Sequence, residues 1–151
     1  MSTIRITKKF HFEAAHALAG YDGPCSNIHG HSYELSLTVL GKPIDQPDSP
    51  KHGMVLDFKE LKQIVTNHII DLFDHSLILS RQSSKELIPS RESPFGKMVI
   101  VDYQPTSENL LLDFVARLKQ LLPPGIKLHN MILKETGTST AEWHADDNPD
   151  Q

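Results

Sequence analysis

Two stretches near the start of the chain place mostly apolar residues at every second position, at residues 4–14 and 31–41. This period is typical of β-strands, because successive side chains of a strand point to opposite faces of the sheet. Lys8 is the exception on the apolar face of the first stretch. The pattern predicts two strands joined by residues 17–28, a connection that is long for a hairpin and typical of a functional or mobile loop.

Two later stretches carry apolar residues at the three- and four-residue spacing of an amphipathic helix. The first follows Asp57, a favourable N-cap residue, and its apolar stripe runs to Leu72. The second begins after Thr106 or Ser107 as N-cap and is stopped by the Pro-Pro-Gly sequence at 123–125. We expect the apolar face of each helix to be part of the core.

The remaining stretches complete a predicted element order of β-β-α-α-β-β. Residues 126–135 predict a third strand and residues 139–144 a short fourth one, whereas residues 80–97 predict a loop rich in Ser, Pro and Gly. The apolar run at 98–101 is either an extra strand or an extended packed segment. The order predicts an α+β fold, a four-stranded antiparallel sheet with two helices packed on one face.

Composition narrows the possible functions. A chain of 151 residues matches one ordinary domain, so residues 1–151 are predicted to fold as a single unit. The net charge of −4 with scattered basic residues argues against a nucleic-acid partner, and no apolar run approaches the ~18 residues that span a membrane. The only cysteine, Cys25, has no internal disulfide partner, which favours a reducing, cytoplasmic location.

Three histidines are predicted to meet at one end of the first two strands. His16 ends the first strand, and His29 and His31 begin the second. An antiparallel pairing with both apolar faces on the same side would bring the three rings together. Three imidazoles with one open position are typical of catalytic Zn²⁺. Chance proximity is the competing interpretation for a His-x-His pair, and Cys25 stays possible as a fourth ligand.

Two acidic positions have both a structural and a functional interpretation. Asp74-His75 follows the first predicted helix, so His75 is either a cation near the negative end of the helix dipole or an imidazole that a carboxylate orients for proton transfer. Glu135 shares a strand face with Met131 and Leu133. It is either exposed at the strand end or buried to bind the N–H groups of a ligand.

These residues together resemble the 6-pyruvoyl-tetrahydropterin synthase superfamily, and most closely its 6-carboxy-tetrahydropterin synthase branch in queuosine precursor synthesis. The matching segments are Phe12-Glu13-Ala14-Ala15-His16, Cys25-x-x-x-His29-Gly30-His31, Asp57-Phe58, Asp74-His75, Pro105-Thr106-Ser107-Glu108 and Lys134-Glu135-Thr136. The gap of three residues between Cys25 and His29 is similar to the carboxy-producing branch. The stretch 80–104 is longer than we expect for the compact members of that branch.

The resemblance implies a tunnelling fold (T-fold) in which the sheets of several copies join edge to edge, as a homo-oligomer and typically a hexamer. It implies 7,8-dihydroneopterin triphosphate as substrate, with 6-carboxy-5,6,7,8-tetrahydropterin, acetaldehyde and triphosphate as products. Two alternatives stay open. One is a 6-pyruvoyl-tetrahydropterin synthase or a related pterin side-chain lyase, and the other is a pterin-binding zinc protein without turnover.

The resemblance also implies a role for each candidate site residue. The three histidines would hold zinc, which polarises the hydroxyl groups of the substrate side chain. Cys25 would be the proton-abstracting base, with Asp74 and His75 as its relay from a neighbouring subunit. Glu135 would anchor the pterin ring through its N–H groups and belong to the catalytic set, with the backbone around Thr106-Ser107 as a further substrate contact.

Overall fold

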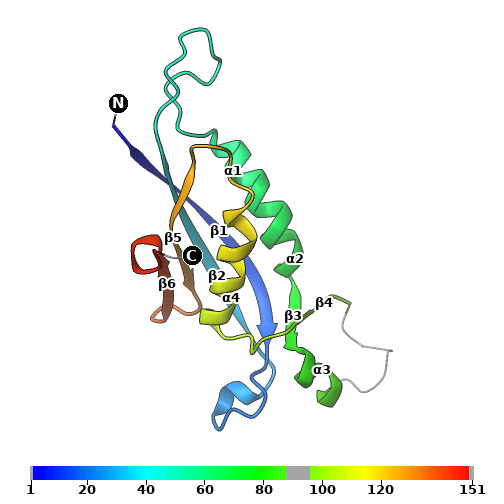
Figure 1. The fold of residues 1–151 in the computed structure, drawn as a ribbon. Helices are drawn as coiled ribbons and strands as arrows, with labels where there is room; N and C mark the ends of the chain where they lie inside the picture. Colours follow the sequence, from blue (N-terminus) through cyan, green and yellow to red (C-terminus); the bar gives the residue numbers. More distant parts are fainter. Residues whose placement is uncertain (1, 88–95, 150–151) are drawn as a thin grey trace.

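The computed structural model describes residues 2–87 and 96–149, which form one curved sheet with helices on one of its faces (Figure 1). The strand order is β4-β3-β1-β2-β5-β6. The strands are β1 (Ile4–His16), β2 (His29–Gly41), β3 (Ser76–Ser80), β4 (Met98–Val101), β5 (Lys127–Lys134) and β6 (Thr140–His144). The helices are α1 (Phe58–Val65), α2 (Asp71–Phe73), α3 (Arg81–Leu87) and α4 (Ser107–Lys119), with a π-helical turn (Thr66–Ile70) between α1 and α2 and 3-10 turns at Pro24–Ser26 and Ala145–Asp147.

The long hairpin of β1 and β2 is the centre of the sheet. Its antiparallel register runs from the Ile4–Gly41 pair to the His16–His29 pair. Side chains that face the helices are buried, as the period-two pattern predicts, and the opposite face is more polar and more exposed. The buried apolar residues on the helix side of the two strands are Phe10, Phe12, Ala14, Tyr33, Leu35, Leu37 and Val39. Both predicted strands are confirmed, and each extends two residues further at the histidine end.

The sheet has six strands and is mixed, so the prediction of a four-stranded antiparallel sheet is wrong in that detail. β3 runs parallel to the end of β1, with Ser76 opposite Ala14, and β4 runs parallel to β3. All five residues of β3 are buried. A strand buried on both faces shows no apolar-polar alternation, which is why the period-two pattern did not reveal it.

The stretch that predicted a loop at residues 80–97 contains a helix. Residues 81–87 form α3, and residues 88–95 lie outside the part of the chain that the structure describes. The apolar run at 98–101, for which the sequence allowed a strand or an extended segment, is β4 at the edge of the sheet. The two strands predicted after the second helix are confirmed as β5 and β6.

Helices α1, α2 and α4 cover one face of the sheet (Figure 1). Phe114 of α4 is fully buried at their junction, where its ring centroid lies 6.0 Å from Phe12 and 5.0 Å from Phe73. The predicted N-caps are confirmed. Asp57 accepts a hydrogen bond from the backbone N–H of Lys59 (2.8 Å), and the Thr106 hydroxyl accepts one from the N–H of residue 109 (3.2 Å). The helices therefore hold the apolar face of the hairpin in place.

Two long connections lie at opposite ends of the molecule (Figure 1). Residues 17–28 join β1 to β2 at the end that carries the histidines, and residues 42–57 lead from β2 to α1 at the other end. In the described part of the chain, no helix is long and apolar enough to cross a membrane.

Candidate functional site

The three predicted histidines lie together at the end of the β1–β2 hairpin. His16 is opposite His29 in the register, and His31 is opposite Ala14 on the same face. Their ring centroids are 4.5 to 5.1 Å apart, and one nitrogen from each ring lies within 4.8 Å of the others. Strand parity therefore predicted this cluster. Among residues 2–87 and 96–149, it is the only group of three potential ligands with metal-binding spacing.

Hydrogen bonds of the Nδ1 atoms set the tautomer and orientation of two of these histidines. Nδ1 of His16 lies 2.7 Å from the carbonyl oxygen of Pro105, and Nδ1 of His29 lies 2.8 Å from that of Asn27. A carbonyl oxygen only accepts, so each Nδ1 carries the hydrogen and donates. Each Nε2 of the neutral rings therefore offers a lone pair, the arrangement that metal-ligating histidines commonly have.

The two Nε2 atoms of His16 and His29 face each other at 3.0 Å. Two lone pairs at this distance repel unless a cation lies beside both. Two imidazole nitrogens bound to the same tetrahedral Zn²⁺ would be ~3.3 Å apart. The third ring contributes an unpaired atom, because Nε2 of His31 is buried without a hydrogen-bond partner among the described residues. The donor set fits a zinc site with three protein ligands and an open fourth position.

Burial favours the neutral form of His16 and His31. The His16 side chain is 2% exposed, and desolvation lowers the pKa of His16 below its ordinary value. Desolvation likewise lowers the pKa of His31. Because the neutral imidazole is the form that binds a metal ion, the cluster is ready to do so at neutral pH.

A cavity of about 270 Å³ lies beside His16 and contains most of the other candidate residues. Its lining comes from the 17–28 loop, the start of α4 and the β5–β6 hairpin: Leu18, Tyr21, Cys25, Thr106, Ser107, Glu108, Glu135, Ser139, Thr140 and Ala141. Cys25 is half-buried, and its carbonyl oxygen accepts a hydrogen bond from the backbone N–H of Leu18 (2.9 Å). The structure thus brings a thiol, a carboxylate and a helix N-terminus to the side of the histidine cluster.

Glu135 is the carboxylate of this cavity, and it reaches toward the histidines. Its Oε1 lies 3.6 Å from Nε2 of His31 and 3.7 Å from Nε2 of His16. The residue directly follows β5, where its backbone N–H donates to the carbonyl oxygen of Ser139 (3.0 Å). Its side chain is 25% exposed. The carboxylate is therefore partly buried in the cavity beside the histidines, and not fully exposed at the strand end.

Asp74 and His75 lie elsewhere in the same chain. His75 is one of the residues around a separate shallow cavity that also includes Glu13 and Ser32 from the other face of the sheet. Asp74 accepts a hydrogen bond from the backbone N–H of Glu13 (2.9 Å), which holds the pKa of the Asp74 carboxyl below its usual range, and it lies 3.0 Å from Nδ1 of His75. Neither residue lines the cavity of Cys25.

The backbone of His75 is in an uncommon conformation, with a φ of +57°. A residue other than glycine pays a conformational cost there, and such costs concentrate at functional sites. The backbone N–H of His75 donates to the carbonyl oxygen of Glu13 (2.6 Å), which holds this conformation and leaves the imidazole 77% exposed. His75 is therefore held outward, with Asp74 beside its ring.

Two tyrosines of the site were not singled out from the sequence. Tyr33 lies two residues beyond His31 on the same strand face, so strand parity contained the signal. Tyr21 lines the Cys25 cavity and is 49% exposed. Its ring packs on Gly23, where a Cβ atom would lie 2.5 Å from a ring carbon and the exposed ring would have to shift.

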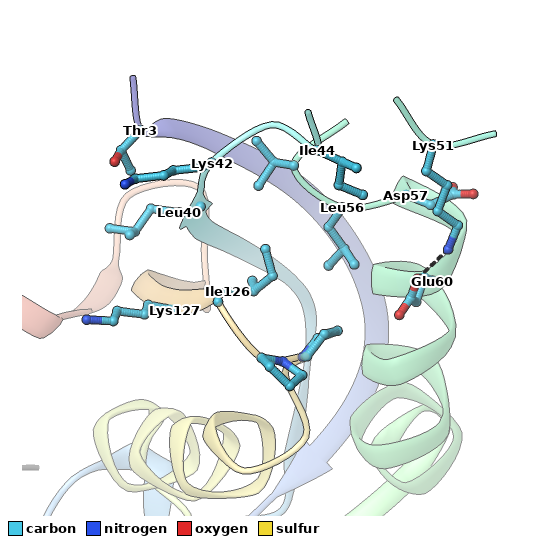
Figure 2. A pocket seen from close by; sticks show the side chains of 15 residues that line it. Thr3, Leu40, Lys42, Ile44, Lys51, Leu56, Asp57, Glu60, Ile126 and Lys127 are labelled. Atoms are coloured by element: carbon cyan, nitrogen blue, oxygen red, sulfur yellow. Dashed lines mark hydrogen bonds and ion pairs between the residues drawn. The ribbon is translucent and has the colours of Figure 1, made fainter. Parts of the chain in front are cut away.

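A larger cavity, about 620 Å³, is at the opposite end of the sheet (Figure 2). Its floor is apolar, with Leu40, Leu56 and Ile126, and a Lys51–Glu60 ion pair of 2.8 Å stands at its rim. None of the candidate site residues lines it. Size alone therefore does not locate the site, whereas the chemistry of the donor groups does.

The fold and the site define a class: an α+β protein with a three-histidine cluster of metal-binding geometry beside a thiol and a carboxylate. The chain belongs to the 6-pyruvoyl tetrahydropterin synthase family of enzymes, whose family model matches residues 5–146. The resemblance inferred from the sequence motifs is thereby confirmed.

Several relatives named 6-carboxy-5,6,7,8-tetrahydropterin synthase are similar over most of the chain. The protein from Haemophilus influenzae is 33% identical over 141 residues, covering 92% of this chain and 97% of the relative. The one from Rickettsia bellii is 36% identical over 110 residues, covering 72% and 75%. The one from Aquifex aeolicus is 32% identical over 162 residues, covering 91% and 96%.

Solved structures share the fold. An uncharacterized protein from Wolinella succinogenes superposes with a TM-score of 0.78 at 20% identity and covers 95% of this chain and 99% of its own. The 6-pyruvoyl tetrahydropterin synthase of Caenorhabditis elegans gives a TM-score of 0.67 at 24% identity, with coverage of 95% and 96%. At these identities the likeness concerns the fold.

Proposed function

We propose that the protein is a zinc-dependent lyase of queuosine precursor synthesis. It would convert 7,8-dihydroneopterin triphosphate and one water molecule into 6-carboxy-5,6,7,8-tetrahydropterin, acetaldehyde and triphosphate. The relatives that carry this name support the reaction. The observation that carries the proposal is the histidine cluster, with its Nε2 lone pairs turned to one point beside the cavity of Cys25 and Glu135.

The histidines would hold zinc through their Nε2 atoms, since the Nδ1 atoms of His16 and His29 are engaged by backbone carbonyls. When bound, the ion supplies Lewis acidity that polarises the hydroxyl groups of the substrate side chain and acidifies the neighbouring C–H bond. The carbonyl oxygens of Pro105 and Asn27 keep both rings in the tautomer that the ion needs.

Cys25 is the group that would remove the proton from this C–H bond. It lines the same cavity as His16. A thiolate needs a partner that takes its proton away, and Asp74 and His75 are our candidates for this relay. Because they line a different cavity from Cys25 within one chain, the relay would come from a neighbouring copy, which makes the active form a homo-oligomer, a hexamer by resemblance to the family.

The pterin ring would bind next to the metal. The Glu135 carboxylate would accept hydrogen bonds from the N–H groups of the ring, and α4 would direct the start of its backbone at the substrate. The Thr106 hydroxyl is already used as the N-cap of α4, whereas the buried Ser107 hydroxyl has no partner among the described residues. Ser107 is therefore the free donor at this position.

The test is to incubate the zinc-loaded protein with 7,8-dihydroneopterin triphosphate and to identify the products by mass spectrometry. We expect acetaldehyde and the 6-carboxylate. A 6-pyruvoyl product, or cleavage to a hydroxymethyl pterin, would favour the alternative lyases. Cys25→Ala should keep its zinc and lose turnover, so equal consumption by both proteins, or by neither, would contradict the proposal. Absence of turnover with retained pterin binding would indicate a non-catalytic zinc protein.

A further inference from the structure

Tyr33 is buried next to the histidine cluster, and its hydroxyl group has no hydrogen-bond partner among the described residues. The residue is 1% exposed, stacked on Phe12 at a centroid distance of 4.9 Å and with its ring 5.5 Å from that of His31. Its hydroxyl is buried and makes no hydrogen bond to any described residue. A buried hydroxyl without a partner is unfavourable, and phenylalanine would fill the same space without that penalty. We therefore expect this hydroxyl to make a hydrogen bond when a ligand is bound.

The strand register points Tyr33 at Glu135. β2 and β5 pair with Glu34 opposite Lys134, so the next position along this antiparallel register sets Tyr33 opposite Glu135 on the histidine face. Burial raises the pKa of the Tyr33 phenol, and the charges of Glu135 and Cys25 raise it further. A phenol is protonated at neutral pH even at its ordinary pKa of about 10, so Tyr33 is a hydrogen-bond donor opposite Glu135.

The Glu135 carboxylate lies near this donor in the free protein, but the two groups do not meet the geometry of a hydrogen bond. Its Oε1 lies within 3.7 Å of Nε2 in both His16 and His31, on the side where the histidine lone pairs converge. Its backbone is fixed by the hydrogen bond to Ser139, so the side chain is the part that can reorient. A carboxylate has two oxygens with about four acceptor positions. A pterin ring edge that donates two N–H groups to the carboxylate would leave at least one acceptor position free for a further donor.

We propose that Tyr33 is a positioning residue for substrate binding: its hydroxyl donates to the Glu135 carboxylate and holds it toward the N–H edge of the bound pterin. The inference rests on the proposed function, in which Glu135 binds the pterin. A hydrogen bond from the hydroxyl would hold the carboxylate away from the histidines. The Tyr33 hydroxyl has no partner in the free protein because, in this proposal, only the bound ligand aligns the Glu135 carboxylate to accept from it.

The test compares two tyrosine hydroxyls. Tyr33→Phe removes the unpaired hydroxyl, and Tyr103→Phe removes one that donates to Asp113 (2.6 Å). The affinity of zinc-loaded protein for neopterin, a fluorescent pterin without triphosphate, is measured by titration, and stability by the melting temperature of the free protein. We expect Tyr33→Phe to bind neopterin about tenfold or more weakly, as loss of a hydrogen bond to a charged group implies, with an unchanged or higher melting temperature. Tyr103→Phe should show the opposite, a lower melting temperature with unchanged affinity.

A double-mutant cycle identifies the partner. If Tyr33 acts through the carboxylate, the loss of affinity in Tyr33→Phe and in Glu135→Gln will not multiply in the double variant. Fully multiplied losses, unchanged neopterin affinity in Tyr33→Phe, or a lower melting temperature of that variant would overturn the inference. Zinc content is measured in every variant, because Tyr33 is two residues from His31. Wild-type protein that binds no neopterin overturns the proposed function itself, and this inference with it.

Discussion

Replacing His29 by alanine is the sharpest perturbation of the histidine cluster. His16 is 2% exposed and its removal would leave a cavity, whereas His29 is only half-buried, so His29→Ala removes a ligand with little loss of packing. The substitution also removes one of the two lone pairs that face each other at 3.0 Å. We therefore expect metal-free His29→Ala to melt no lower than metal-free wild type.

Losing one ligand should reduce the rise in melting temperature that zinc produces. Zinc at 100 times its dissociation constant stabilises the folded state by about 2.7 kcal/mol, which for a chain of this size raises the melting temperature by about 5–11 °C. Changes in hydrogen-bond partners of metal ligands alone weaken binding about 10–100-fold. Loss of an imidazole should exceed that, so the variant at the same zinc concentration would gain about 0.4 kcal/mol or less, about 1–2 °C.

The assay is thermal unfolding of chelator-treated protein with and without added zinc. His68→Ala is the matched control, because His68 is an exposed histidine in the π-helical turn and far from the cluster in sequence. We expect the control to keep the full zinc-dependent shift. An equal shift in wild type, His29→Ala and His68→Ala would refute the assignment of this cluster as the metal site.

Three further results are expected. Cys25→Ala and His75→Ala should each be inactive. If the relay comes from a neighbouring copy, the two variants refolded together should regain activity. A mixture as inactive as its parents would argue against a shared site. Metal-free protein should lose stability as the pH falls below about 6.5, the ordinary pKa of histidine. Burial lowers the pKa of His16 in the folded state, so the unfolded chain binds more protons in this range. Urea titrations at pH 7.5 and 5.5 measure the change, and a gain of stability at pH 5.5 would contradict the prediction. Phe114→Ala should cost about 3–5 kcal/mol in urea unfolding, whereas Leu112→Ala, at a position 49% exposed, should cost little, and equal losses would argue against the described core.

Much of the site could be predicted because local periodicity controls it. The parity that sets His16, His29 and His31 on one face depends only on two continuous strands and their pairing. Helix caps are equally local, so Asp57 and Thr106 were identifiable from their own neighbours. These features needed no knowledge of the rest of the chain.

Other features depend on partners distant in sequence and were beyond reach. Ser76–Ser80 is buried on both faces between β1 and β4, so its sequence carries no alternation that distinguishes a strand from other packed segments. The separation of His75 from Cys25 within one chain depends on where α2 ends beside the sheet, which spacing along the sequence does not encode. The unpaired hydroxyl of Tyr33 is likewise visible only once its surroundings are in place.

The outer strands of the sheet, β4 and β6, have no further strand beside them in the described part of the chain. If β4 of one copy docks on β6 of the next, every contact is head-to-tail and repeats the same rotation. Such a series either closes on itself or grows without limit, and the twist and curl of each sheet decide between the two. A substitution that flattened the hairpin could thus convert a finite ring into a fibre while leaving each chain correctly folded.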